Sequence, residues 1–542
     1  MKVAGYGFIL LTALVGAASA NSFSTRELHK RLYTYPSHVK TSAGSYIIQF
    51  EDDAPDNHTD NYHAMSGVEV KHQYSSVFNG ISVRTDDSVQ PLDLAKVDKI
   101  KRVWPVRHYL TASQSSSSSA DSLYAPYVHK PTGVEKAVEE LGLSGKGVRI
   151  AIIDTGVDYN HPELGACWKT EGCLWQYGED LVGDDFNPPL NQLELNPGPY
   201  PMDCVGHGTH VAGIIAGQGP TIRGVAPNAT LGMYRVFGCS GPNGESGTSD
   251  DVLLQAFDKA SNDKSDIVSM SLGGDSWPNE PISVAAAKLA SQGIVVVAAA
   301  GNDGDGGLFT ASAPAVAKGV ISVGSVSGWN YTVMDVSISN GQTTKSVMTT
   351  LSTSFQVPFK FDSDTPLIIP TLTSNKTDCA IVEEDLTGSV TIFTKTPDCT
   401  VGKITRALVS AGAAGVVIIN TDPGLFYPSF ESLNASVIVV TQEDGQGILN
   451  MIAEASTTIK GPTSDAYIIQ AADEAGHLSN FSSIGPDPYL DLAPHVLAPG
   501  GNIYSTFLVK QGGYFVMSGT SMACPYVSGS VALLKEARPD LT

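Results

Sequence analysis

Basic residues are scarce in this chain. Its 542 residues include 33 Lys and Arg against 55 Asp and Glu, a formal net charge of −22. Proteins bind nucleic-acid backbones through clustered Lys and Arg, so this charge opposes such a partner, whereas it favours solubility in an extracellular medium. We therefore expect no nucleic acid among the partners.

Long apolar runs are also scarce. After residue 20 no segment approaches the roughly 18 uncharged apolar residues that a membrane-spanning helix needs. Residues 1–20 combine Lys2, a short apolar stretch and the small residues Ala18-Ser19-Ala20. This pattern is typical of a secretory signal peptide, whereas the alternative, a membrane anchor, needs a longer uninterrupted stretch. We predict a secreted, extracellular protein without a membrane span.

Cysteine is rare as well, with seven in the chain. Cys167 with Cys173, and Cys379 with Cys399, lie close enough in sequence for local disulfides in an oxidising compartment. Cys524 is predicted to be the odd one, buried and free. Sequons for glycosylation agree with export and begin at six positions, Asn57, Asn228, Asn330, Asn375, Asn434 and Asn480.

The length predicts three or four structural units. Residues 45–110 alternate short β-like runs with helix-compatible stretches, which indicates a small α+β unit. Residues 113–119 are all serine except Gln114. Such a stretch cannot bury a core, so we predict an exposed linker that is open to cleavage.

Strands alternate with helices from about residue 125 to residue 326. Continuous apolar runs predict strands at 148–154, 229–236, 267–272 and 294–300, and helices are predicted to begin at His207, Asp250 and Pro281. Continuous apolar strands between helices are typical of a parallel sheet covered on both faces. We predict a doubly wound α/β fold, which binds ligands at its strand ends.

The alternation ends near residue 327, and the chain up to residue 470 is richer in Thr, Ser and Val. Its one strongly patterned unit is a helix predicted at 407–415 that runs into a strand at 416–420. We predict an inserted, mainly β domain. Such an insertion explains why His207 and Ser521 are 314 residues apart.

Three distant residues have the types that nucleophilic hydrolysis needs. Asp154 ends an apolar run and precedes Thr155-Gly156, His207 lies in Gly206-His207-Gly208-Thr209-His210, and Ser521 lies in Gly519-Thr520-Ser521-Met522-Ala523. A serine hydroxyl attacks at neutral pH only when an imidazole takes its proton, and a buried carboxylate fixes the tautomer of that imidazole.

Each of these residues also has a plainer interpretation. Asp154 is typical of a helix N-cap or of an aspartic-protease pair, although the chain has no second Asp-Thr-Gly. His207 with His210 is compatible with a metal site, but no carboxylate stands at the zincin spacing. A base therefore ranks above a metal ligand, and we expect no metal and no cofactor.

Ser521 opens a predicted buried helix, where a serine also serves as a cap. The free N–H groups of the same helix start favour an oxyanion, so both roles can coexist. Asn302 follows Ala300-Gly301 at the end of a buried strand. Its plainer role is in a turn, but an amide there can donate to a developing oxyanion.

Taken together, these motifs resemble the subtilisin-like serine proteases, the subtilases, in that family's order of Asp, His and Ser. The resemblance covers about residues 131–542, apart from the insertion. It implies that Asp154, His207 and Ser521 are catalytic and that Asn302 is the oxyanion asparagine. It also implies protein or peptide substrates.

The same resemblance assigns the domains. Residues 21–112 look like an inhibitory propeptide that acts as a partner of the enzyme, 113–130 like a linker, and 131–326 with 471–542 like two parts of the catalytic domain. The inserted residues 327–470 look like a protease-associated domain, on the match of Gly412, Gly415, Asn420 and Asp444-Gly445. The layout is similar to that of secreted subtilases of the minor extracellular protease type.

In the family, Ser271-Leu272-Gly273 and Ala300-Gly301 form the walls beside the substrate side chain that precedes the cleaved bond, the P1 side chain. These residues are small or apolar, so a broad, uncharged P1 preference is expected. Only 21 residues follow Ser521, whereas family members continue through further helices. The second catalytic part is therefore expected to be truncated.

We predict a secreted serine endopeptidase that uses Asp154, His207 and Ser521 with Asn302. The alternative is an inactive, truncated homologue that acts as a binding module through its inserted domain. A lipase-like hydrolase would need Gly-X-Ser-X-Gly around the nucleophile and the order Ser, Asp, His, and Ser521 meets neither requirement.

Overall fold

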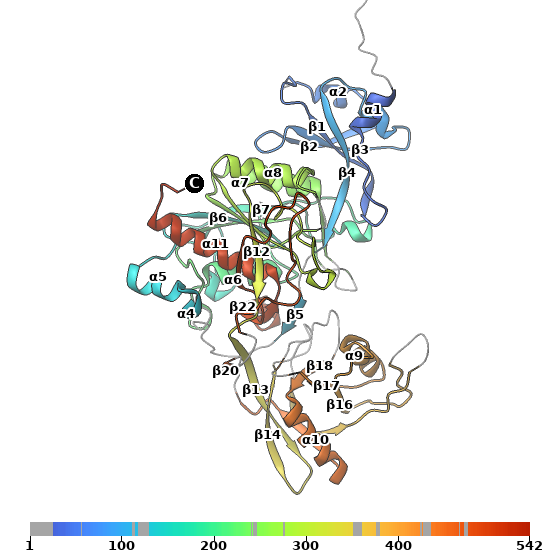
Figure 1. Ribbon diagram of the computed structural model, residues 1–542, viewed down its shortest axis with the longest axis vertical. Helices are drawn as coiled ribbons and strands as arrows, with labels where there is room; N and C mark the ends of the chain where they lie inside the picture. The colour runs from blue at the N-terminus through green and yellow to red at the C-terminus, as the bar shows by residue number, and fades with distance from the viewer. Residues whose placement is uncertain are drawn as a thin grey trace, which may run out of the picture.

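The computed structural model describes residues 25–541 except 56, 111–113, 118–128, 240, 242–245, 275–276, 351–359, 375–379, 423–424, 426–434, 465–466 and 471–474. The predicted signal peptide, Cys379 and two of the sequon asparagines, Asn375 and Asn434, lie outside the described residues. An N-terminal unit, a central α/β unit and an inserted unit follow one another along the long axis of the molecule (Figure 1).

The N-terminal unit is a four-stranded antiparallel sheet with short helices. Its elements are α1 (Thr25–Arg31), β1 (Thr41–Phe50), α2 (Asp60–His63), β2 (Val68–Tyr74), β3 (Gly80–Thr85), α3 (Pro91–Leu94) and β4 (Ile100–Leu110). Adjacent residues on a strand face opposite ways. Ile48 therefore packs inside this unit, whereas Ile47, with Trp104, belongs to the core shared with the central unit.

The central unit is built on a seven-stranded sheet in which every pairing is parallel, in the order β21-β12-β11-β10-β6-β8-β7. The strands are β6 (Arg149–Asp154), β7 (Trp175–Asp180), β8 (Thr230–Arg235), β10 (Ile267–Met270), β11 (Val295–Ala299), β12 (Ile321–Val326) and β21 (Val496–Pro499). The five inner strands are mostly apolar and buried, as the sequence predicts for a sheet covered on both faces, whereas the edge strands β7 and β21 include polar or exposed residues.

Helices cover both faces of this sheet, which confirms the predicted doubly wound fold. One face packs against α7 (Asp250–Asn262) and α8 (Pro281–Ser291), and the other against α6 (His207–Ala216) and α11 (Thr520–Ala537). The shorter α4 (His129–Thr132) and α5 (Val134–Leu141) precede β6, and β9 (Gly247–Ser249) leads directly into α7.

The strand order reverses around β6. The chain passes from β6 to the edge strand β7, returns to β8 beside β6, and then continues on the other side of β6 with β10 and β11. Ligands bind at such a reversal, outside the carboxyl ends of the strands. Asp154, Ser271 and Ala300 stand at or just after three of these ends.

The inserted unit combines antiparallel and parallel strands. Its elements are β13 (Asn330–Ser339), β14 (Thr344–Thr350), β15 (Phe361–Ile368), β16 (Val390–Thr394), α9 (Val401–Ser410), β17 (Gly415–Ile419), β18 (Ser436–Val440), α10 (Gln442–Glu454), β19 (Thr458–Gly461) and β20 (Tyr467–Gln470). Val336 and Ile338 of β13 share a buried cluster with Tyr504 and Val516. The unit therefore docks on the small sheet of β22 (Ile503–Thr506) and β23 (Tyr514–Ser518).

Two local predictions differ from the structure. A strand, β5 (Gln114–Ser117), lies where the sequence predicts an exposed linker, and it pairs antiparallel with β23. Strand pairing uses backbone groups, which a serine-rich stretch has like any other. The helix predicted at 407–415 is α9, which begins at Val401 and ends at Ser410, because Gly412 adopts a left-handed φ of 97°.

Two cysteine predictions are confirmed. Cys167 and Cys173 form a disulfide, and Cys524 is buried and free. Burial raises the pKa of the Cys524 thiol to about 12, so this thiol is unreactive. Cys399 is disulfide-bonded, while its predicted partner Cys379 is outside the described part.

Among the helices in the described part of the chain, none is long and apolar enough to cross a membrane.

Candidate active site

Asp154 and His207 form a buried pair at the carboxyl edge of the central sheet. Asp154 ends β6, and its Oδ1 accepts the backbone N–H of Thr155 at 2.7 Å. His207 begins α6, and its Nδ1 lies 2.7 Å from the same Oδ1. The two residues are only 1% and 3% exposed. Because a carboxylate only accepts, Nδ1 carries the proton and Nε2 keeps the lone pair that a general base needs.

A second buried carboxylate, Asp203, holds the turn that leads into α6. It accepts the backbone N–H groups of Val205, Gly206 and Thr209 at 2.9, 2.8 and 3.0 Å. The Thr209 hydroxyl donates to it at 2.6 Å. Gly206 has a φ of 102°, a conformation that favours glycine. These bonds fix the backbone immediately before His207.

The two carboxylates set the pKa of His207. Burial lowers this pKa, but the charge of Asp154, its hydrogen bond and the charge of Asp203 outweigh burial, so the pKa stands above its usual value. Both carboxylates stabilise the imidazolium that forms when the ring takes a proton. The environment therefore makes His207 a stronger base than a free histidine.

The other histidine of the motif, His210, faces away from this pair. Its Nε2 lies 3.1 Å from the carbonyl oxygen of Ile503 and 3.0 Å from that of Phe515, so this nitrogen donates to the β22–β23 sheet. Burial lowers the pKa of His210 to about 3, which keeps the ring neutral. His210 thus has a structural role in packing α6 against this sheet.

Ser521 lies in the first turn of α11, completely buried. Its Oγ donates to the carbonyl oxygen of Ser271 at 3.0 Å, and the Ser271 hydroxyl donates to the carbonyl oxygen of Ser521 at 2.8 Å. Nε2 of His207 has no hydrogen-bond partner among the described residues. In this form the serine hydroxyl is therefore held by Ser271 rather than by the histidine.

Strand register connects Ser521 to Asp154. Met270 of β10 is paired with Ile153 of β6, so the next residues, Ser271 and Asp154, leave the sheet side by side. Ser521 is bound to Ser271, and α11 packs on α6, the helix that carries His207. All three residues predicted as a triad thus lie at one edge of the sheet.

Asn302 lies just after β11 with its side chain oriented by Thr520. Its Oδ1 accepts both the backbone N–H and the hydroxyl of Thr520 at 2.9 Å. Two donors on one atom identify that atom as the oxygen. The Nδ2 of Asn302 faces Gly519, because a Cβ on that glycine would be 3.4 Å from Nδ2 and 3.7 Å from Cβ of Ser521. A donor N–H group is thus directed to the neighbourhood of the serine.

The residues expected to line the substrate follow two neighbouring strands. Ser271-Leu272-Gly273 follow β10, and Ala300-Gly301 follow β11. Leu272 is 2% exposed and Ala300 is fully buried. Gly301 has a φ of 110° and donates its N–H to the Thr520 hydroxyl at 3.3 Å. None of these residues brings a charged side chain to the edge.

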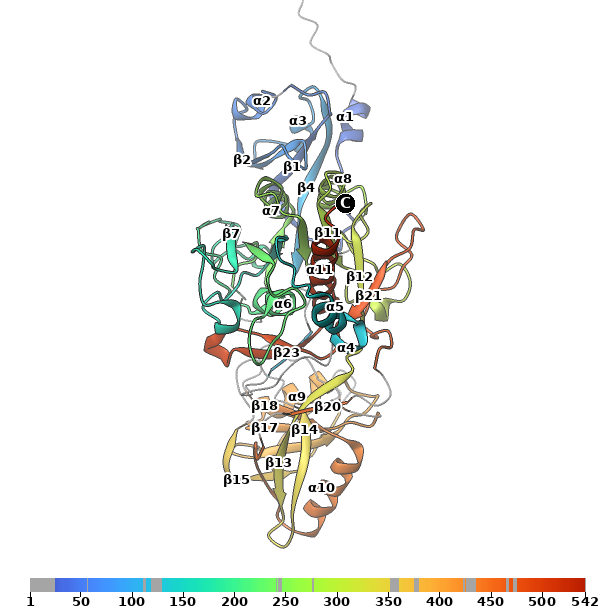
Figure 2. The ribbon, with the colours of Figure 1, turned by 90° about the vertical axis from the view of Figure 1, so that its left-hand side faces the viewer.

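The chain that enters from the N-terminal unit pairs with two strands of the central unit. His108, Tyr109 and Leu110 of β4 pair antiparallel with Ser249, Thr248 and Gly247 of β9. Further on, β5 pairs with β23, with Gln114 opposite Ser518, three residues before Ser521. Figure 2 shows β4 running from the N-terminal unit down to the central unit.

Sequence comparison identifies the family. Residues 145–542, more than half of the chain, match the Subtilase family. The chain belongs to the subtilase family. The resemblance predicted from the three motifs is therefore confirmed.

Named relatives of this subtilase are proteases. It is 32% identical over 495 residues to "Minor extracellular protease Vpr" of Bacillus subtilis (strain 168), covering 88% of this chain and 57% of that protein. It is 27% identical over 511 residues to the "PIII-type proteinase" of Lactococcus lactis subsp. cremoris (strain SK11), covering 86% of this chain and 25% of that protein. The chain thus spans between a quarter and somewhat more than half of the length of these relatives.

Among solved structures, fervidolysin from Fervidobacterium pennivorans, a keratinolytic enzyme related to subtilisin, aligns at 17% identity with a TM-score of 0.47. The alignment covers 94% of this chain and 57% of that one.

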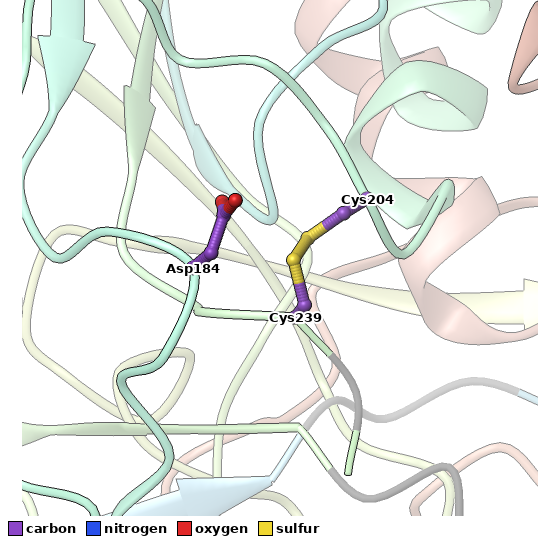
Figure 3. Close-up of side chains that lie close together, drawn as sticks. All are labelled: Asp184, Cys204 and Cys239. Atoms are coloured by element: carbon purple, nitrogen blue, oxygen red, sulfur yellow. A yellow bond between two sulfur atoms is a disulfide. The ribbon is translucent and has the colours of Figure 1, made fainter.

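The subtilase carries a second disulfide beside the site, which the sequence analysis missed. Cys204 and Cys239 are bonded to each other, with Asp184 beside them (Figure 3). Three such side chains resemble a metal-binding cluster. Their sulfurs are joined to each other, however, and cannot serve as thiolate ligands. Asp184 instead pairs with Arg235, whose Nη2 lies 2.8 Å from its Oδ1.

This disulfide ties two parts of the site together. Cys204 lies in the turn between Asp203 and His207, and Cys239 follows β8 on the way to β9. Cys204 and Cys239 are 35 residues apart, and this spacing does not indicate a disulfide in the sequence. The roles of Asp203 and Thr520 were also missed, although Thr520 stands in the Ser521 motif, because buried hydrogen-bond partners leave no pattern in one sequence.

Removing the Cys204–Cys239 disulfide by a double Cys→Ser substitution is expected to lower the free energy of unfolding by about 4 kcal/mol, because it closes a long loop. The matched control is the same change at Cys167 and Cys173, six residues apart, for which the expected loss is about 2 kcal/mol. Denaturant titration of both variants checks the order. Equal losses would show that loop closure is not the cause.

Proposed function

We propose that this subtilase is a secreted serine endopeptidase in which Ser521 is the nucleophile, His207 the general base and Asp154 the residue that orients it. The observation that carries the proposal is the buried hydrogen bond of 2.7 Å between Nδ1 of His207 and Asp154, at the sheet edge shared with Ser521. Membership of the subtilase family supports it.

The first half of the reaction acylates Ser521. A rotation about its Cα–Cβ bond moves Oγ from the Ser271 carbonyl to Nε2 of His207, which takes the proton as Oγ attacks the peptide carbonyl carbon. The tetrahedral intermediate then collapses, the C–N bond breaks, and the amine leaves with the proton from His207. Asp154 keeps the ring in the right tautomer and stabilises its charged form.

The intermediate carries a negative charge on oxygen. Nδ2 of Asn302 and the backbone N–H of Ser521, at the positive end of α11, are the proposed donors to it. Because both hydrogen bonds of Thr520 hold the amide oxygen, Asn302 needs no reorientation when the charge forms. In the second half, water gives a proton to His207 and attacks the acyl carbon. The C–Oγ bond then breaks while His207 returns the proton to Oγ, which releases the carboxylic acid and Ser521.

We further propose that the N-terminal unit is an inhibitory propeptide and that the enzyme cuts the chain between residues 110 and 114. Support comes from the two strand pairings, which are of the kind that an extended substrate makes and the second of which reaches Ser518, three residues before Ser521. The intervening residues, Thr111-Ala112-Ser113, are small and uncharged. They agree with an uncharged P1 preference, which the lining by Ser271-Leu272-Gly273 and Ala300-Gly301 also supports.

Docking of this unit depends on Asp258 of α7. Its carboxylate accepts three consecutive backbone N–H groups, those of Ser75, Ser76 and Val77, at 3.0, 3.1 and 3.0 Å. The loop between β2 and β3 is thereby fixed on the central unit. Asp258 is buried, and a carboxylate that accepts several N–H groups in such a place forms strong, charge-assisted bonds.

Secretion and a protease-associated role for the inserted unit complete the proposal. Two disulfides and the exposed sequon residues Asn57, Asn228 and Asn480 support export. The parallel strands β15 to β18, with α9 and α10, support the assignment of the inserted unit. The inserted unit lies at the end of the molecule opposite the N-terminal unit, which suits a role outside the chemistry (Figure 1).

The Ser521→Ala variant of the full chain is expected to remain unprocessed, to lose labelling by a fluorophosphonate, and to lose peptidase activity by about 10⁴-fold or more. The matched control is Ser530→Ala on the same helix, whose hydroxyl donates only to the carbonyl of Tyr526. Intact mass, N-terminal sequencing and peptide hydrolysis are the measurements. Undiminished processing and hydrolysis by Ser521→Ala would overturn the mechanism.

Asp154→Asn tests the electrostatic role of the carboxylate. The base must be neutral, and Asp154 raises the pKa of His207, so removing its charge is expected to move the acid limb of kcat/KM to lower pH. At the same time kcat should fall by about 10⁴-fold through loss of the correct tautomer. Asp305→Asn, an exposed carboxylate, is the control. An acid limb that stays in place or moves to higher pH contradicts the assignment.

Asp258→Ala leaves three backbone N–H groups of the N-terminal unit without their acceptor. Each bond to a charged group contributes about 1.5–3 kcal/mol, so we expect a several-fold lower yield of processed protein. Asn262→Ala, which removes an exposed contact to Ser76 on the same helix, is the control. If both variants yield as much processed protein as wild type, Asp258 does not anchor the unit.

A further inference from the structure

Two carboxylates of the central unit, Asp250 and Glu280, are buried beneath the N-terminal unit beside β9. Asp250 is the first residue of α7 and directly follows β9, and Glu280 is the N-cap of α8. They are 0% and 2% exposed. Neither takes part in the mechanism above. Buried carboxylates are unfavourable unless they are paired, so their partners are informative.

Arg107 of β4 contacts both carboxylates, and Glu280 also accepts the Tyr33 hydroxyl at 3.2 Å. Nη1 of Arg107 lies 3.1 Å from Oε2 of Glu280, and its backbone N–H donates to Oδ2 of Asp250 at 3.1 Å. The Arg107 guanidinium is also within 4.9 Å of the ring centre of Tyr109 and 5.8 Å of that of Tyr35. The guanidinium thus contacts the carboxylate of Glu280 directly, is close enough to Asp250 to interact with its charge, and lies beside two aromatic rings, which together suit this group.

Tyr109 completes the contact on the same face of the strand. Its hydroxyl donates to Oδ1 of Asp250 at 2.7 Å. Residues two apart on a strand share a face, so Arg107 and Tyr109 both turn toward the acidic pair. Burial raises the pKa of Asp250 to about 7, while Arg107 and the Tyr109 hydrogen bond oppose the rise and the charge of Glu280 adds to it.

Arg107 lies on the path of an extended substrate. The next three residues, His108 to Leu110, are those that pair with β9. A peptide that adds to the same edge of β9 in the same direction brings the residue equivalent to Arg107 to the acidic pair. For a cut between residues 110 and 114, that residue is four to seven positions before the cleaved bond.

We propose that Asp250 and Glu280 form an acidic subsite of the substrate cleft, occupied by Arg107 before processing and by a basic side chain of a protein substrate, arginine above all, in the processed enzyme. The proposal rests on the proposed function. When the N-terminal unit leaves, it takes Arg107 with it and exposes two carboxylates that a substrate cation can pair with. Specificity then resides several residues from the cut, while the P1 side chain stays uncharged.

The test uses the processed wild-type enzyme and two fluorogenic peptides that reproduce residues 104–118 of the chain. One keeps the arginine at position 107 and the other carries Arg107→Gln. We expect kcat/KM to be about tenfold higher for the arginine peptide at low ionic strength, with the difference shrinking as salt screens the pair. No variant enzyme is needed for this comparison, so folding does not affect it.

Variants then assign the preference to its residues. Glu280→Gln and Asp250→Asn are each expected to bring the ratio of the two kcat/KM values toward one. The matched control is Glu194→Gln, because Glu194 also pairs with an arginine of the N-terminal unit, Arg84 at 2.7 Å, but is exposed. This control is expected to keep the wild-type ratio. A ratio unchanged in both subsite variants overturns the assignment.

The remaining outcomes separate the two proposals. Equal kcat/KM values for the two peptides with active wild-type enzyme would show that the acidic pair serves only to anchor the N-terminal unit, and would overturn the subsite while the proposed function stands. If wild type cleaves neither peptide faster than Ser521→Ala does, the proposed function fails as well.

Discussion

The site depends on the parallel pairing of β6 with β10 and of β10 with β11. Ile153 is opposite Met270, and Met270 is opposite Ala298, so the three strands end at nearly the same level. Asp154, Ser271 and the turn toward Asn302 leave the sheet there together. A slip of one residue in either pairing would turn the following side chains to the opposite face. Burial of the apolar strand residues on both faces of the sheet fixes this register, and the register in turn places the polar groups of the site.

Placing an ionisable pair at that edge requires compensation. Burial acts against the charged forms of Asp154, Asp203 and His207. Hydrogen bonds from backbone N–H groups compensate for this cost: one reaches Asp154 and three reach Asp203. These bonds require a turn of defined shape before α6, and the left-handed Gly206 and the Cys204–Cys239 disulfide both restrict that turn. The turn before α6 thus both stabilises the buried charges and fixes the position of His207.

The N-terminal unit uses the same edges that the proposed chemistry needs. β4 pairs with β9 and β5 pairs with β23, so backbone pairing holds the chain to the central unit at two places. Strand addition uses backbone hydrogen bonds, so the serine-rich residues of β5 can pair with β23. Side chains decide affinity instead: Asp258 binds one loop, and Asp250 with Glu280 bind Arg107. In the proposed subsite, Asp250 and Glu280 serve both docking and substrate recognition.

The strands and helices of the central unit follow from local pattern. The apolar run before Asp154 is a buried strand because nothing in it competes with burial, and the helices predicted to begin at His207, Asp250 and Pro281 begin there. In the inserted unit the predicted helix is displaced, because small residues at 411–415 are compatible with a helix while Gly412 ends it. A stretch of small residues leaves the boundary to tertiary contacts.

By itself the sequence determined the fold class, the family and the residue types of the site, because these depend on hydrophobic period and on short motifs. Only the tertiary structure decided that Asp203 lies beside His207, that Cys204 pairs with Cys239, and that Arg107 reaches Glu280. Those contacts join residues up to 173 positions apart. These contacts form because charged groups and sulfur atoms are buried together in a packed interior. Which groups meet there depends on the tertiary fold and not on the sequence neighbours of each residue.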